Sequence, residues 1–391
     1  MFIDYTPSER ALVAQLRAYF AEVVTDEVLG EITGTEGGGP LYTKALKRMG
    51  ADGWLGIGWP KEFGGQGRSA IEQYIFFDEV QRAGFPIPFL TLCTVGPTLM
   101  KYGTDEQKAR FLPAILRGEV HFAIGYSEPG AGTDLASLRT KAVRDGDEYV
   151  VDGQKVFTSL AEYADYVWLA VRTDPAAAKH KGISILMVDT KSKGFSLSPI
   201  NTLGENRTNA TYYENVRVPV SARVGRENEG WKLITTQLNH ERVALSPAGP
   251  ADRFVDETAA WARETKTSGG KRVIDEPWVQ ANLARARASV NVLRLLTWRQ
   301  AWNIDQGKLD PAESSTVKVF GSEAFIRIYG ALLEVLGQEG YLKDRSPGSR
   351  LRGRIERFYR TSIVLTFGGG ANEVQRDIIA MTGLQMPRAP R

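Results

Sequence analysis

The sequence has little of several features that would assign it to a class at once. It contains a single cysteine, Cys93, which excludes an internal disulfide framework and suits a reducing cytoplasm. The first residues lack a basic start, and no apolar stretch reaches membrane-spanning length, so we expect an untargeted, soluble, cytoplasmic protein. Lysine and arginine number 49 against 46 aspartate and glutamate, which gives no reason to expect nucleic acid. No metal site is predicted.

At 391 residues the chain is long enough to bury a large core, and the spacing of its apolar residues changes twice. Helical spacing over residues 1–119 begins with a capping signal, Thr6 followed by a proline and Glu9. Period-two runs rich in β-branched and aromatic residues occupy 120–228, and helical spacing returns over 229–391. The predicted fold class is α+β, with an N-terminal helical domain, a small antiparallel β domain and a C-terminal four-helix-type bundle.

The expected helices are residues 7–24, 41–49, 69–82, 90–102, 105–117, 231–263, 277–305, 311–337, 351–365 and 373–382. Residues 31–40, with clustered glycines, are expected to form a loop. Two Asp-Gly pairs, at 145–146 and 152–153, bracket a run of alternating residues and predict hairpin turns. We therefore expect the segments around 122–134 and 152–159 to lie on neighbouring strands of one sheet.

Residues 127–134 (SEPGAGTD) follow a short apolar strand at 122–126. The proline removes one backbone donor, and the two glycines let backbone N–H groups approach a ligand closely. Such a turn suits an anion such as a pyrophosphate. Turns of small residues are common, however, and taken alone Ser127 and Thr133 are better explained as turn-capping hydroxyls and Phe157 as a core aromatic.

The combination of segments is more specific than any one of them. Residues 126–135 (YSEPGAGTDL), followed by 140–142 (TKA) and 152–158 (DGQKVFT), resemble the flavin-binding signature of the acyl-CoA dehydrogenase family. The resemblance continues in order along most of the chain and implies FAD between the β domain and the C-terminal bundle. The residues that it assigns to FAD are Tyr126, Ser127, Phe157, Thr158 and Ser159 at the ring, Gly132 and Thr133 at the pyrophosphate, and Glu373 in the C-terminal segment.

Dehydrogenation between the α and β carbons of a thioester needs a carboxylate on one face of the substrate and the flavin on the other. Many members of the family carry this glutamate in a C-terminal motif that corresponds here to residues 367–376, with Gly369 at the catalytic position. A glycine cannot abstract a proton. The family's second solution is a Leu-x-x-Glu-Arg run in a C-terminal helix, which corresponds to residues 238–242. The resemblance therefore makes Glu241 the catalytic base.

The pair Glu241-Arg242 also fits an ordinary solvated helix surface. Two observations favour the catalytic interpretation: the side of the helix that bears Leu233, Leu238 and Leu245 is apolar, and no other candidate replaces the missing C-terminal glutamate. Arg242 is assigned to the acyl-CoA substrate as a contact to coenzyme A. A helix-anchoring ion pair explains Arg242 equally well.

One feature of the family is absent after the first long C-terminal helix. The family usually has an Arg-x-x-Phe-Gly segment there, which reaches the adenosine half of a neighbouring subunit's flavin, and residues 262–272 lack the Phe-Gly pair. The departure implies a sister subunit that supplies this arm, in a heterotetramer with half the usual number of flavins. The chain resembles the glutamate-bearing subunit of actinobacterial dehydrogenases that act on steroid side-chain thioesters. A tolerated loop change in a homotetramer is the alternative.

The resemblance thus implies an FAD-dependent acyl-CoA dehydrogenase that introduces an α,β double bond into a bulky acyl-CoA. Its electrons would leave through an electron-transfer flavoprotein. Two alternatives keep the fold. One replaces that acceptor with oxygen, as in related oxidases and monooxygenases, and the other makes the chain a non-catalytic scaffold that stabilises a sister subunit.

Overall fold

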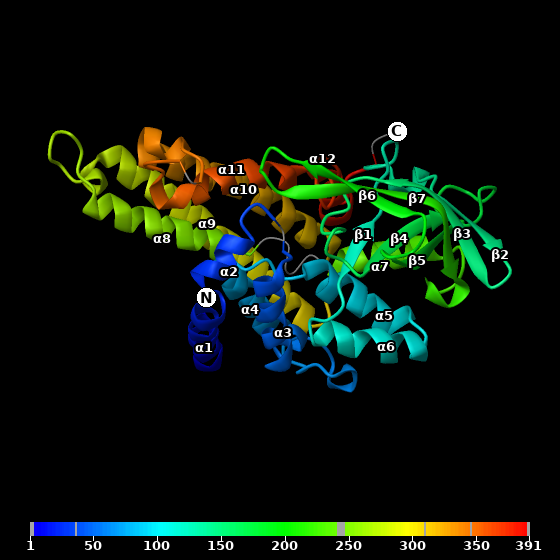
Figure 1. Ribbon diagram of the computed structural model, residues 1–391. Helices are drawn as coiled ribbons and strands as arrows, with labels where there is room; N and C mark the ends of the chain where they lie inside the picture. The colour runs from blue at the N-terminus through cyan, green and yellow to red at the C-terminus, as the bar shows by residue number, and fades with distance from the viewer. Residues whose placement is uncertain (1–3, 36, 241–246, 309, 345, 389–391) are drawn as a thin grey trace.

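The computed structural model describes residues 4–35, 37–240, 247–308, 310–344 and 346–388. A group of helices, a β-sheet and a second group of helices follow one another along the chain, so the predicted α+β class is confirmed. In Figure 1 the N-terminal helices lie at the bottom, the sheet at the right, and most of the C-terminal helices along the top and left.

The helices before the sheet are α1 (Pro7–Val23), α2 (Asp26–Glu31), α3 (Pro40–Ala51), α4 (Ala70–Arg82), α5 (Gly96–Tyr102) and α6 (Asp105–Leu116). Capping boxes begin three of them, where the hydroxyls of Thr6, Ser69 and Thr104 each accept a hydrogen bond from a backbone N–H of the first turn. The sequence did not predict α2. A π-helical turn over Thr91–Val95 precedes α5, so the helix expected at 90–102 changes its hydrogen-bond period partway along.

The strands are β1 (Phe122–Gly125), β2 (Lys141–Asp145), β3 (Glu148–Lys155), β4 (Tyr166–Arg172), β5 (Ile183–Asp189), β6 (Phe195–Asn201), β7 (Arg207–Pro219) and β8 (Arg223–Val224). They pair in the order β6-β7-β3-β2-β4-β5-β8, and β1 pairs in parallel with β4. Most other pairs are antiparallel. Side chains such as Tyr149, Val167 and Leu169 fill the core on one face of the sheet.

One of the two predicted hairpin turns is wrong. Asp145 pairs with Glu148, so the first Asp-Gly turn joins β2 to β3 as expected. The second Asp-Gly pair lies inside β3, where the register against β7 shifts at Gly153 and forms a β-bulge. Gly153 has φ +152°, and a Cβ atom there would lie 2.6 Å from Oγ1 of Thr140. The glycine is therefore required for the close approach of β3 to the residue before β2.

The helices after the sheet are α7 (Gly230–His240), α8 (Gly249–Glu264), α9 (Pro277–Asp305), α10 (Pro311–Leu336), α11 (Arg354–Ser362) and α12 (Asn372–Ile378). The single helix expected over 231–263 is wrong, because Pro247 and Ala248 are not helical and separate α7 from α8. Gly249 begins α8 close against α4: its N–H donates to Oδ1 of Asp78 at 2.7 Å, and a Cβ atom would lie 2.2 Å from the Asp78 carbonyl oxygen.

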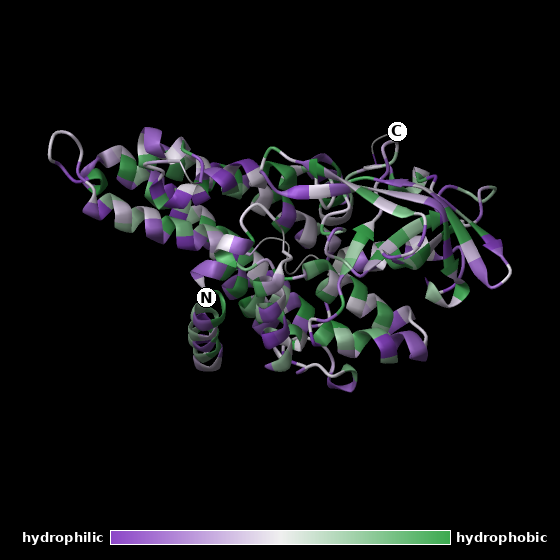
Figure 2. Ribbon diagram, in the orientation of Figure 1, coloured by the Kyte–Doolittle hydropathy of each residue, from purple (hydrophilic) through white to green (hydrophobic). Residues whose placement is uncertain are grey.

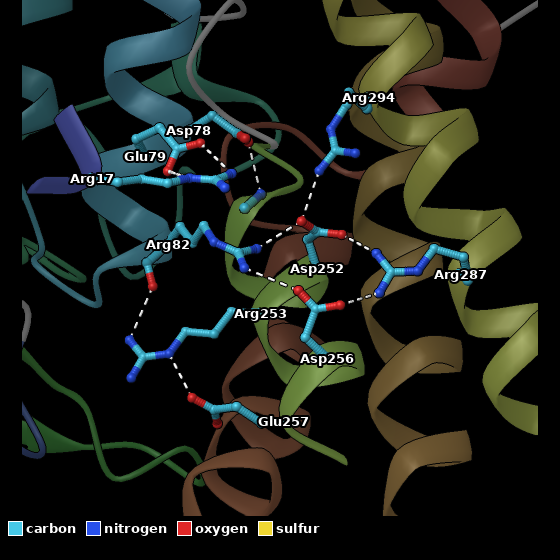
Figure 3. Close-up of polar contacts among 11 residues, drawn as sticks. Arg17, Asp78, Glu79, Arg82, Asp252, Arg253, Asp256, Glu257, Arg287 and Arg294 are labelled. Atoms are coloured by element: carbon cyan, nitrogen blue, oxygen red, sulfur yellow. Dashed lines mark hydrogen bonds and ion pairs between the residues drawn. The ribbon is translucent and has the colours of Figure 1, made fainter. Parts of the chain in front are cut away.

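Asp252 on α8 joins the N-terminal helices to the C-terminal helices. Its carboxylate pairs with Arg82 of α4 at 2.6 Å, with Arg294 of α9 at 2.9 Å and with Arg287 of α9, as Figure 3 shows. Asp78 lies beside this network, and burial raises its pKa to about 6 against the opposing charge of Arg294. Removal of one partner would leave a buried charge uncompensated, so the network fixes α8 and α9 against α4.

Figure 2 shows hydrophobic and hydrophilic residues interspersed along the helices. Within the described ranges, no helix combines the length and the apolar character needed to cross a membrane. The helices bury one side and expose the other, which is the pattern of helices that pack around a core.

Candidate active site

The turn after β1 leaves open space on its outer side. Within the turn itself, the N–H of Glu128 donates to the carbonyl oxygen of Ala131 at 2.9 Å, and the N–H of Ala131 donates to the carbonyl oxygen of Glu128 at 3.1 Å. Gly130, Gly132 and Thr133 are exposed, and a Cβ atom on either glycine would have no neighbour within 4 Å. The two glycines are therefore not needed to fit the turn against the rest of the chain, and the space beside them is available to a ligand.

A buried ion pair holds this turn from behind. Nζ of Lys155, at the end of β3, donates to Oε1 of Glu128 at 2.8 Å, and Glu128 also accepts the backbone N–H groups of Arg139 and Thr140 at 2.7 and 2.8 Å. Burial lowers the pKa of Lys155 to about 8, with Glu128 opposing. For Glu128, burial acts to raise the pKa, but the charge and hydrogen bond of Lys155 outweigh it and the pKa is lowered. Both residues lie in the flavin-signature segments, but no local pattern indicated that they form an ion pair.

The second segment of the motif begins where β3 ends. The N–H of Val156 donates to the carbonyl oxygen of Ser127 at 2.9 Å, so the two segments lie side by side. The strands that lead to them are not neighbours as expected, because β1 pairs with β4 whereas β3 pairs with β2 and β7. Backbone contacts beyond the strand ends, rather than strand pairing, bring the two segments together.

Phe157, in this segment, has an unusual backbone conformation and an exposed side chain. Its φ is +59°, a left-handed conformation that costs about 1–2 kcal/mol for a residue other than glycine, and the residue is 67% exposed. Its neighbours are held firmly: the N–H of Thr158 donates to the Asn209 carbonyl oxygen at 2.9 Å, and Oγ of Ser159 donates to Oγ1 of Thr208 at 3.2 Å. Backbone strain of this kind, fixed by its surroundings, is typical of functional sites.

The side chain of Thr158 is buried. Its Oγ1 lies 3.4 Å from Oγ1 of Thr211 on β7. The roles predicted for Tyr126, Ser127, Phe157 and the other motif residues toward a flavin stay predictions.

Tyr126 connects the end of β1 to α7. Its hydroxyl donates to Oε1 of Gln237 and accepts a hydrogen bond from Nε1 of Trp168 on β4 at 3.2 Å. Gln237 is fully buried, and among the described residues its Nε2 has no hydrogen-bond partner. Sequence reasoning missed Gln237 and Trp168, because neither lies in a motif and their spacing from Tyr126 carries no local signal.

The predicted catalytic base, Glu241, and the predicted substrate contact, Arg242, lie outside the described residues. The last residue described before them is His240, at the end of α7.

The C-terminal segment of the motif is held by α10. Lys318 is buried, and its Nζ donates to Oδ1 of Asn372 at 2.7 Å and to the carbonyl oxygen of Gly370. Gly369, the position that corresponds to the family's C-terminal glutamate, has φ +66° and open space where a Cβ atom would lie. Glu373 is exposed in the first turn of α12. Among the described residues, no group of three or more His, Cys, Asp or Glu side chains is placed to hold a metal ion.

Three family models match the chain in order. They are the acyl-CoA dehydrogenase N-terminal domain over residues 6–119, the middle domain over 123–216 and the C-terminal domain over 228–384. Together these matches span most of the described chain, and they occur in the same order as the two helical groups and the sheet between them.

Close relatives agree with the family models. The chain is 56% identical to acyl-CoA dehydrogenase FadE26 and 51% identical to acyl-CoA dehydrogenase FadE29, both of Mycobacterium tuberculosis, and both comparisons cover 100% of each chain. Two solved structures also match over 100% of each chain. One is a chain of the ChsE4-ChsE5 complex from M. tuberculosis, at 56% identity and a TM-score of 0.94, and the other a chain of the Tcur3481-Tcur3483 steroid ACAD, at 52% identity and a TM-score of 0.95. The chain belongs to the acyl-CoA dehydrogenase family and is an oxidoreductase that acts on CH–CH bonds.

Proposed function

We propose that the chain is the glutamate-bearing subunit of an FAD-dependent acyl-CoA dehydrogenase that desaturates a bulky, steroid side-chain thioester. The observation that carries the proposal is Phe157, an exposed aromatic ring on a strained backbone beside the open Gly130–Gly132 turn. A large exposed aromatic is unfavourable in water and suits a flat ligand ring that covers it.

The described residues fit FAD at this place. The flavin ring would lie against Phe157 and Ser127, and the pyrophosphate would lie at Gly132 and Thr133, where exposed backbone and open space are available. When bound, the flavin supplies the acceptor for the hydride that leaves the β carbon of the acyl group. The Lys155–Glu128 pair contributes by holding the turn in place before the cofactor arrives.

We assign the removal of the α-carbon proton to Glu241. A carboxylate there would take that proton as the hydride leaves the β carbon, so that the two carbons gain a double bond. The hydrogen bonds of Tyr126 with Gln237 and Trp168 anchor α7, the helix that leads to Glu241, against the sheet. Arg242 is proposed to contact the coenzyme A part of the substrate.

The steroid substrate and the sister subunit are proposed from two sources. One solved relative at 52% identity is named a steroid ACAD, and the relative at 56% identity is named as a complex of two different chains. In this chain, residues 265–272 form a short turn in which the N–H of Thr267 donates to the Lys271 carbonyl oxygen at 2.8 Å. This turn replaces the family's Phe-Gly arm, so the flavin site needs an arm from another chain.

An apolar stripe on α9 offers a surface for that association. It consists of the exposed side chains Trp278, Val292, Leu295 and Trp302. At 100° per residue these four positions span an arc of about 120° around the helix, so they lie on one side of it. Exposed apolar side chains gathered in this way are typical of protein–protein contacts.

The base is tested by Glu241→Gln, which keeps the size of the side chain and removes its basicity. We expect the flavin to stay bound, as judged by the visible spectrum, while turnover of a steroid side-chain acyl-CoA falls by about 10² or more. The control is Glu264→Gln, which removes an exposed carboxylate at the end of α8 and should keep full activity. Normal turnover in Glu241→Gln would eliminate Glu241 as the base.

Two further measurements separate the alternatives. The chain is purified alone and with its sister subunit, and the flavin content of each sample is measured. Flavin only in the mixed sample, at half an equivalent per chain, supports the shared site; one flavin per chain in a homotetramer contradicts it, and no flavin in either sample supports a scaffold.

Rapid reoxidation of the reduced protein by air would favour an oxidase over transfer to an electron-transfer flavoprotein. A panel of acyl-CoA esters would test the preference for a steroid side chain.

A further inference from the structure

A cavity of about 560 Å³ lies where α2, α8 and α11 meet. Its walls come from α2 and the residues after it, the end of α4 with the turn that follows, the first turns of α8, and α11 with the residues before it. None of the described residues predicted to bind flavin lines it. The volume lies within the range of small-molecule sites, so the cavity is a candidate for a second ligand.

Positive charge dominates the wall of this cavity. The charged side chains that line it are Arg82, Arg253, Arg352, Arg354 and Arg357, and the carboxylates Asp26 and Asp344. A concave surface lined by charges of one sign concentrates its field and attracts ions of the opposite sign. The ligand that suits this wall is therefore an anion.

Carboxylates behind the wall neutralise only part of this charge. Arg82 pairs with Asp252 and Asp256, and Arg352 pairs with Asp26 at 3.2 Å. Arg253 and Arg354, in contrast, share a single carboxylate, that of Glu257, at 2.7 Å each. Figure 3 shows Arg82, Arg253 and Glu257 in this arrangement. Because one carboxylate serves two guanidinium groups, an excess of positive charge remains at the cavity.

Arg357 lacks an acceptor altogether within the part of the chain that the structure describes. It forms no hydrogen bond or ion pair there, and its guanidinium carbon lies 5.9 Å from the centre of the Phe358 ring. Burial lowers its pKa, and attraction to Asp344 and Glu205 only partly offsets that effect. A half-buried guanidinium without an acceptor is costly, and a bound oxyanion would provide the missing hydrogen bonds.

We propose that this cavity binds a small phosphorylated metabolite, with its phosphate or pyrophosphate seated on Arg354 and Arg357. The planar fork of a guanidinium group matches two phosphate oxygens at once, which a lysine does not achieve. The ring of Phe358 gives the same wall an apolar surface suited to a flat group such as a nucleobase. The phosphate comes either from a free nucleotide or from the 3′-phosphorylated adenosine half of a coenzyme A molecule. The proposal does not depend on the dehydrogenase reaction.

The test measures binding by calorimetry to the flavin-loaded protein, assembled with its sister subunit where it requires one. The probes are inorganic pyrophosphate, ADP and adenosine 3′,5′-bisphosphate. We expect one saturable site per copy of this chain, and at least about tenfold weaker binding in Arg357→Met, which removes a charge-assisted pair of hydrogen bonds. The control is Arg327→Met, because the Arg327 guanidinium also lies beside a phenylalanine ring, 6.0 Å from the centre of Phe320, but outside the cavity.

Each outcome of the binding measurements either supports the proposed anion site or overturns it. Tighter binding of ADP identifies a nucleotide, and tighter binding of the 3′,5′-bisphosphate identifies coenzyme A; either supports the site if Arg357→Met weakens it. No saturable binding up to about 10 mM, or equal binding in Arg357→Met, would overturn it. Binding that is lost in Thr133→Val and kept in Arg357→Met would place the ligand at the flavin turn and also overturn the proposal. If Arg357→Met does not fold, Arg357→Lys keeps the charge without the fork and should bind with intermediate affinity.

Discussion

The ammonium nitrogen of Lys155 lies 2.8 Å from Oε1 of Glu128, and both side chains are almost completely removed from solvent. Lys155 also donates to the carbonyl oxygen of Tyr126 at 3.0 Å, and Glu128 accepts two backbone N–H groups from the chain just before β2. These contacts connect the turn after β1, the start of β2 and the end of β3. The pair therefore sets the backbone on which the predicted flavin contacts stand.

Glu128→Gln should destabilise the protein strongly, because it leaves the charge of Lys155 buried without a partner. We expect the free energy of unfolding to fall by about 3–5 kcal/mol in urea titrations. Glu148→Gln removes one carboxylate from an exposed pair with Arg217 and should cost less than about 1 kcal/mol. Similar losses in the two variants would show that the buried pair has no special role. Addition of Lys155→Met to Glu128→Gln should recover part of the loss.

Stability should rise with pH in the range where Lys155 titrates. Burial lowers the pKa of Lys155 from 10.5 to about 8 in the folded state. Between these values the unfolded chain holds a proton that the folded chain has lost, so this group makes unfolding less favourable as the pH increases, by at most about 1.4 kcal/mol per pH unit. Denaturant titrations of the wild type and Lys155→Met across this range measure the effect. Parallel curves for the two proteins would contradict the lowered pKa.

Phe157→Gly should separate flavin binding from folding. The glycine relieves the strain of φ +59° but gives the unfolded chain more freedom, so the free energy of unfolding should change by less than about 1 kcal/mol. The affinity for FAD should fall by about tenfold, because the exposed ring is lost, and fluorescence titration of the apoprotein measures this loss. Leu160→Gly, at φ +65°, is the matched control and should keep its flavin affinity. Equal losses in both variants would contradict a direct contact of Phe157.

Lys318→Met should release the C-terminal loop without altering the sheet. The variant loses the charged hydrogen bonds of Nζ to the carbonyl oxygens of Thr366 and Gly370 and to the buried side chain of Asn372. We expect a loss of about 2–4 kcal/mol and faster hydrogen exchange over residues 366–376. Lys308→Met, on an exposed position after α9, is the control and should leave exchange unchanged. Unchanged exchange in Lys318→Met would show that α12 alone holds the loop.

The sequence predicted helix boundaries correctly where the interactions that set them join residues close together in the chain. The bounds of α9 were predicted as residues 277–305, because a proline suits the first turn and a glycine follows the last residues of the helix. The capping box at Thr6 placed the start of α1 correctly, because its hydrogen bonds join residues within one turn.

The incorrect predictions concern segments whose conformation depends on a residue elsewhere in the chain. Gly153 was expected in a hairpin turn, but the nearness of Thr140 makes it a bulge inside β3. The helix expected over 231–263 is interrupted before Gly249, which lies against Asp78, 171 residues earlier in the chain. The spacing of apolar residues contains no information about such neighbours.

The sequence by itself determined the order of helical and β regions, the family, and the motif residues on which the flavin proposal rests. Only the tertiary structure decided that Lys155 neutralises Glu128, that Gln237 and Trp168 meet at Tyr126, and that Arg357 lines a cavity with no acceptor in the described part of the chain. The physical reason is the distance along the chain over which each interaction acts. Caps and apolar periodicity act over a few residues, whereas desolvation and ion pairing depend on which distant segments folding brings together.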